Sequence, residues 1–115
     1  MINFPKFFKS LGYAFEGIAA LIKLENNARI HLLATATVLI AGYISNITTY
    51  EWDWLAIAIA LVWICEAFNT AIEALVDLVS PDKHPVAKKV KDLSAAAVLF
   101  AAVFAAYIGI KIFIF

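Results

Sequence analysis

The chain has 115 residues, of which 64% are hydrophobic, and its mean hydropathy is +0.89. A soluble domain of this size is about half apolar, so the excess indicates a protein in contact with lipid. Nine basic and nine acidic residues give a formal net charge of zero, which provides no basic field for nucleic acid. The single cysteine, Cys65, excludes a disulfide framework within the chain.

The first predicted element is an amphipathic helix over residues 5–24. Apolar residues recur there at helical spacing, and charged residues interrupt the apolar stripe. A helix of this kind lies on a membrane surface more readily than it crosses one. The charged residues are Lys6, Lys9, Glu16 and Lys23.

Three longer apolar segments follow, over residues 30–47, 54–79 and 93–115. Each is long enough to cross a bilayer core of about 30 Å as a helix. Residues 1–115 therefore predict a single all-α domain, an integral membrane bundle of three transmembrane helices with an N-terminal surface helix. So small a chain buries little polar surface by itself, and we expect an oligomer.

Charge in the connections predicts the topology. Residues 45–53 contain no lysine or arginine, whereas residues 80–92 contain four lysines and the N-terminal flank adds further basic residues. By the positive-inside rule, the N-terminus and the second connection are cytoplasmic. Lys111 near the outer end opposes this only mildly, because a long side chain can snorkel to the interface.

The second span carries four polar residues, Glu66, Asn69, Glu73 and Asp77, spaced by three, four and four positions. This spacing places them on one helical face over about 16 Å. A carboxylate at the centre of a membrane helix costs about 2.5–3.5 kcal/mol to insert, and neighbouring carboxylates repel one another without a cation or proton. Hard oxygen ligands suit magnesium, so the face predicts a cation site. The simpler alternative is that these groups only join helices by hydrogen bonds.

The same four residues occupy the half of the span that approaches the lysine-bearing connection. Glu25 lies before the first span on that side, and Lys91 and Asp92 lie before the third. No glycine-rich phosphate loop is present, since the chain has only four glycines. Phosphoryl transfer requires positioning, divalent charge and a proton acceptor rather than a particular loop. The cluster therefore permits nucleotide chemistry at the cytoplasmic interface.

Four ordered motifs resemble one known family. They are GYAFEG at 12–17, ENNARIH at 25–31, EAFNTAIE at 66–73, and HP at 84–85 followed by Ala87 and Lys91-Asp92. Over nearly its whole length the chain is similar to the small prokaryotic diacylglycerol kinases, a family that includes undecaprenol kinases. The resemblance implies a homotrimer in the bacterial inner membrane that uses ATP and Mg²⁺ to phosphorylate diacylglycerol or undecaprenol. Its active sites are expected at subunit boundaries near the cytoplasmic face.

The resemblance also implies roles for individual residues. Glu66 is expected to be the catalytic base, with a third metal ligand as its alternative role, and Asn69 is expected to position the reacting groups. Glu25 and Glu73 are expected to hold magnesium. The expected nucleotide contacts are Lys6, Tyr13, Glu25, Glu73, His84, Lys91 and Asp92.

Some of these positions carry weaker expectations. Tyr13 could instead anchor the surface helix, and His84 could be a solvated loop residue. Lys6 stands where the family usually has arginine, which keeps the charge and loses bidentate phosphate binding. Asp77 receives no role, and His31 is expected at the membrane interface.

Two functions of other classes are compatible with an intramembrane glutamate. One is a small cation-coupled transporter with Glu66 as the coupling site. That reading leaves the cytoplasmic cluster of Glu25, Lys91 and Asp92 unexplained. The other is a non-catalytic assembly subunit.

Overall fold

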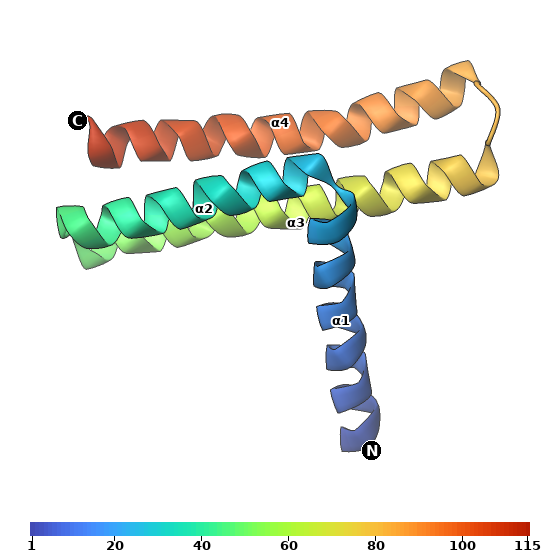
Figure 1. Cartoon of the computed structure of the whole chain (residues 1–115), viewed down its shortest axis with the longest axis horizontal. Coiled ribbons are helices and arrows are strands. Elements are labelled where there is room, and N and C mark those ends of the chain that lie inside the picture. The colour runs from blue at the N-terminus through green and yellow to red at the C-terminus, as the bar shows by residue number, and fades with distance from the viewer.

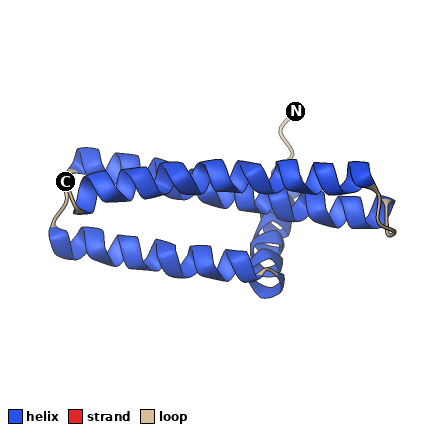
Figure 2. Cartoon of the chain, turned by 90° about the horizontal axis from the view of Figure 1, so that it is seen from above, coloured by secondary structure: helices blue, strands red, loops and turns tan.

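The computed structural model describes residues 1–115 and is entirely helical. Its helices are α1 (Phe4–Leu24), α2 (Asn26–Ser45), α3 (Thr49–Val79) and α4 (Pro85–Phe113). α2, α3 and α4 run side by side, and α1 projects away from them near the start of α2 (Figures 1 and 2). The last three are long and apolar enough to cross a membrane. The predicted all-α fold with three spans is confirmed, whereas the position of α1 on a membrane surface stays a prediction.

The helices α2, α3 and α4 begin four to eight residues earlier than the apolar runs indicated, and polar side-chain caps start α3 and α4. At α3, Thr48 Oγ1 accepts a hydrogen bond from the Glu51 backbone N at 3.1 Å, and Glu51 Oε1 accepts from the Thr48 N at 2.9 Å. At α4, the His84 side chain accepts from the Val86 backbone N at 3.1 Å, and Pro85 suits the first helical position. The lysines after Pro85 are therefore helical rather than in a loop.

The junction between α1 and α2 is a single extended residue, Glu25, with φ −109° and ψ 119°. Arg29, one turn into α2, folds back over the end of α1. Its Nε donates to the Ile22 carbonyl at 3.1 Å, and its Nη2 donates to the Lys23 carbonyl. A cation at these last carbonyls satisfies acceptors that the helix leaves open. Arg29 thereby ties the end of α1 to the start of α2.

The opposite connection, between α2 and α3, depends on close packing. Asn46 ends α2 in the left-handed conformation, with φ 54°. A Cβ added at Gly42 would lie 2.8 Å from Trp52 Cη2, so only glycine allows α3 to approach here. The Trp52 ring therefore packs directly against the backbone of α2 beside the turn that joins α2 to α3.

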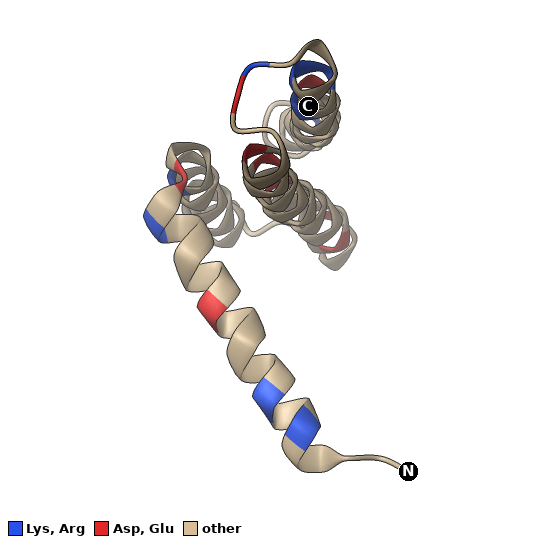
Figure 3. Ribbon diagram, turned by 90° about the vertical axis from the view of Figure 1, so that its right-hand side faces the viewer, with Lys and Arg blue, Asp and Glu red and all other residues tan.

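The core is small and lies mainly between α3 and α4. Only 11 of the 115 residues are buried, among them Leu55, Ala58 and Val62 on α3 and Ala101 and Ile108 on α4. Charged residues gather around the α3–α4 connection and along α1 (Figure 3). The rest of the bundle exposes large apolar side chains, which need lipid or further protein to cover them.

Candidate active site

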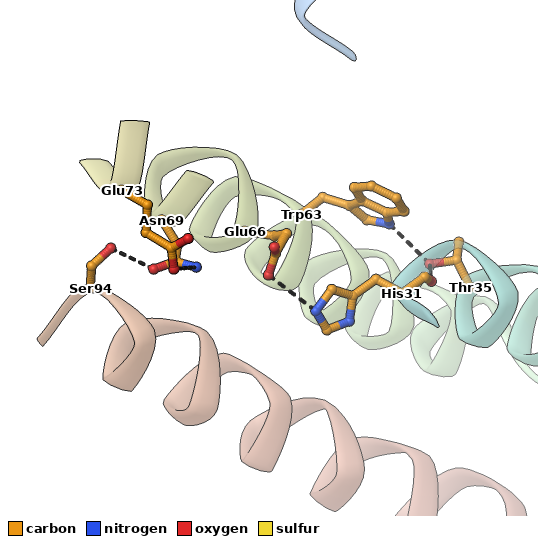
Figure 4. Close-up of polar contacts among 7 residues, drawn as sticks. All are labelled: His31, Thr35, Trp63, Glu66, Asn69, Glu73 and Ser94. Carbon is orange, nitrogen blue, oxygen red and sulfur yellow. Dashed lines mark hydrogen bonds and ion pairs between the residues drawn. The ribbon is translucent and has the colours of Figure 1, made fainter. Parts of the chain in front are cut away.

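Glu66 is the most deeply buried large side chain, with 1% of its surface exposed. It points from α3 toward α2, where His31 Nε2 lies 3.3 Å from its Oε2 (Figure 4). Neither carboxylate oxygen accepts a hydrogen bond of good geometry within the chain. Burial of a carboxylate without such bonds is costly, so Glu66 requires a partner that donates the missing hydrogen bonds.

The imidazole of His31 is itself held in place. The Trp63 ring packs edge-on against it, with the ring centroids 6.4 Å apart. Trp63 Nε1 donates to Thr35 Oγ1 at 2.9 Å, and Thr35 Oγ1 donates to the His31 carbonyl at 2.7 Å (Figure 4). These contacts join α2 to α3 beside Glu66. The sequence does not reveal which residues of α2 contact which residues of α3, so the contact of His31 with Glu66 was not predicted.

Asn69 lies one turn further along α3 and is fixed from two sides. Its Oδ1 accepts a hydrogen bond from Ser94 Oγ on α4 at 2.7 Å, and its Nδ2 donates to Glu73 Oε1 at 3.2 Å (Figure 4). Asn69 and Ser94 are both buried. Ser94 had no assigned role from the sequence, yet it sets the orientation of the amide. The face of α3 therefore divides, with Glu66 directed at α2 and Asn69 at α4.

An open pocket of about 560 Å³ lies where α3 ends and α4 begins. Lys91 on α4 makes an ion pair with Asp77 on α3. Lys88 Nζ lies 2.6 Å from Asp92 Oδ2 one turn along α4. His84, Lys91 and Asp92, three of the predicted nucleotide contacts, line this pocket together with Asp77. Asp77, which received no role from the sequence, thus pairs with a lysine that is predicted to contact nucleotide.

The remaining predicted residues lie elsewhere in the chain. Lys6 and Tyr13 are exposed on α1, and Glu25 is half-buried at the junction of α1 and α2. No three His, Cys, Asp or Glu side chains come together as a metal-ligand group. The magnesium site built from Glu25 and Glu73 stays a prediction. Glu73 suits the role chemically, because Asn69 engages only its Oε1.

Comparisons with known proteins identify the family to which the chain is similar. A model of the family described as prokaryotic diacylglycerol kinase matches residues 12–113. The chain is 38% identical to an undecaprenol kinase of Bacillus subtilis over 95% of this chain and 89% of that protein. It is 36% identical to a diacylglycerol kinase of Synechocystis over 91% of this chain and 61% of that longer protein. It is 29% identical to a diacylglycerol kinase of Escherichia coli over 90% and 84% of the two chains.

Proposed function

The chain belongs to the prokaryotic diacylglycerol kinase family, and we propose on that basis that it transfers the γ-phosphoryl group of ATP to a membrane lipid alcohol. The acceptor is diacylglycerol or undecaprenol, and the products are the lipid phosphate and ADP. The protein would act in the bacterial inner membrane, with its N-terminus and the α3–α4 connection in the cytoplasm. The basic residues of that connection support this orientation.

The observation that carries the proposal is the buried carboxylate of Glu66, which has no hydrogen bond within the chain. An unsatisfied buried acceptor costs about 1–3 kcal/mol, and a charged one costs more. A lipid hydroxyl that enters from the membrane would supply the missing donor. In the proposed reaction, Glu66 takes the hydroxyl proton as the lipid oxygen bonds to the γ-phosphorus and the bond to ADP breaks.

The neighbouring residues supply what phosphoryl transfer further requires, namely positioning and neutralisation of charge. Ser94 and Glu73 fix the amide of Asn69 beside the base. When bound, Mg²⁺ would neutralise the phosphate oxygens, and Glu25 and Glu73 are the carboxylates proposed to hold it. Lys91, Asp92 and His84 line the cytoplasmic pocket, and Lys6 and Tyr13 on α1 would complete the nucleotide site.

A homotrimer fits the surface of the single chain. Most large apolar side chains are exposed, and Glu25 forms no metal-ligand group with other residues of the same chain. A neighbouring copy could cover the apolar surface and bring its own carboxylate to the site. The cation-coupled transporter has no support in the fold or in the names of the relatives, which are lipid kinases.

A direct assay tests the proposed activity and identifies the acceptor. The full chain, purified in mixed micelles, would be incubated with γ-labelled ATP, Mg²⁺ and either diacylglycerol or undecaprenol. We expect label in a lipid phosphate with at least one of these alcohols and none in micelles that lack both. Label in neither lipid, at any Mg²⁺ concentration, would contradict the proposal.

A further inference from the structure

The group closest to the proposed base is a histidine that the proposed mechanism does not use. His31 Nε2 lies 3.3 Å from Glu66 Oε2, and it is the sole basic nitrogen within ion-pair distance of that carboxylate. The histidine side chain is only 17% exposed. A polar side chain buried in a membrane helix is costly unless it serves a partner or a function.

Two other polar side chains near Glu66 are already engaged. The amide oxygen of Asn69 accepts from Ser94, and its nitrogen donates to Glu73. Trp63 Nε1 donates to Thr35. Asn69 and Trp63 are therefore unable to orient the Glu66 carboxylate without breaking bonds of their own. The Thr70 hydroxyl, one turn along α3, is buried without a partner but makes no hydrogen bond to Glu66, whereas His31 lies within ion-pair distance of the carboxylate.

The surroundings of His31 are those of a preorganised side chain. The edge-on Trp63 ring restricts the imidazole, and the Thr35 hydroxyl bonds both to Trp63 and to the His31 carbonyl. A group that positions a base must itself be held, because a misplacement of about 1 Å can reduce a rate 100-fold. The 3.3 Å separation is longer than a formed charge-assisted hydrogen bond, and such contacts often tighten only when substrate binds.

We propose that His31 is a positioning residue for the kinase reaction. Its Nε2–H donates to Glu66 Oε2 and holds the carboxylate so that Oε1 remains available to the lipid hydroxyl. His31 touches neither lipid nor nucleotide in this proposal and acts only through Glu66. The inference rests on the proposed function, because it presupposes that Glu66 is the base.

Three substitutions test this role in the full-length protein. H31L replaces the imidazole with an apolar side chain of similar bulk and so removes the N–H donor. H31Q keeps an N–H donor at the end of the side chain. The matched control is G42A, which disturbs the packing of α2 against α3 at Trp52, about three turns away from His31, and leaves His31 and Glu66 untouched. Thermal unfolding of each variant reports on packing, and steady-state kinetics with the lipid substrate report on catalysis.

If His31 positions the base, H31L should reduce kcat by about 10- to 100-fold and leave the KM for ATP within about twofold. H31Q should recover a substantial part of that kcat, and G42A should keep kcat near the wild-type value. Wild-type kcat in H31L, or H31Q as impaired as H31L, would overturn the inference. So would equal losses of kcat in H31L and G42A, because a loss of packing between α2 and α3 would then explain both.

A parallel measurement separates failure of the inference from failure of the proposed function. E66Q should be inactive in the same assay. If E66Q is inactive and H31L is fully active, the base stands and the positioning role falls. If E66Q turns over like the wild type, Glu66 is not the base, and the role of His31 falls with it.

Discussion

At the scale of single residues, the two central polar groups of the site, Glu66 and Asn69 on α3, differ in how many hydrogen bonds they make. Asn69 is bonded at both ends of its amide, whereas Glu66 has only the loose contact with His31. An amide that is hydrogen-bonded at both its oxygen and its nitrogen is suited to fix geometry. A carboxylate without hydrogen bonds is suited to accept a proton. The spacing of Glu66, Asn69 and Glu73 allowed the shared face to be predicted from the sequence. The contacts of His31 and Ser94 could not be, because spacing within one helix does not reveal how its neighbours are rotated.

Ser94 provides a test of the fixed amide. Serine-to-alanine substitution at this position leaves Asn69 Oδ1 buried without its donor, which should cost about 1–3 kcal/mol of stability. It should also lower kcat, because the amide of Asn69 can then rotate away from the reacting groups. T37V is the control, since the Thr37 hydroxyl bonds only to the Leu33 carbonyl in its own helix. Comparison of thermal midpoints and kcat for the two variants checks this, and equal, unchanged kcat values would contradict it.

At the scale of the helices, composition predicted which segments are helical and failed to place their starts. An apolar run marks the part of a helix that lies in lipid, whereas Thr48 and His84 start α3 and α4 in polar sequence. The consequence is functional at α4. Because the helix begins at Pro85, Lys91 lies two turns inside it and reaches Asp77 on α3. The lysine is thus presented from a rigid helix rather than from a loop.

The approach of α2 to α3 gives a prediction at the same scale. In G42A, the added methyl group would meet the Trp52 ring at 2.8 Å, and such overpacking typically costs about 1–3 kcal/mol. In G109A, by contrast, the added methyl group meets no atom within 4 Å, so this variant should unfold at or above the wild-type temperature. Thermal unfolding in the same detergent compares the two. A G42A protein as stable as G109A would mean that the Trp52 contact does not limit the packing of this turn.

At the scale of the whole molecule, a single chain neither covers its apolar surface nor brings all the predicted site residues together. Only 11 of its residues are buried, and the predicted site residues fall into four places: the exposed surface of α1, the α1–α2 junction, the second half of α3 and the pocket where α3 ends and α4 begins. The sequence predicted these residues individually from family motifs and spacing. It could not show which of them one chain brings together, because that depends on the packing of helices and on neighbouring copies.

Shared sites between copies make a specific prediction. If Glu25 and Glu66 of one active site come from different chains, E25Q and E66Q variants should each be inactive alone. Co-assembly of the two variants should then restore part of the activity, because some sites would receive both intact carboxylates. Lipid kinase assays on each variant and on the mixture measure this, with native mass spectrometry to count the chains. No recovery in mixed oligomers would indicate that each site lies within one chain.

The central claim, that Glu66 is the base of a lipid kinase, is tested most directly by measuring turnover and nucleotide binding in the same E66Q sample. Glutamine preserves the size of the side chain and cannot take the proton, so we predict loss of lipid phosphorylation with nearly unchanged binding of Mg²⁺ and ATP. E73Q serves as the contrast and should weaken the binding of Mg²⁺ and ATP. An E66Q protein that phosphorylates lipid at the wild-type rate would contradict the account.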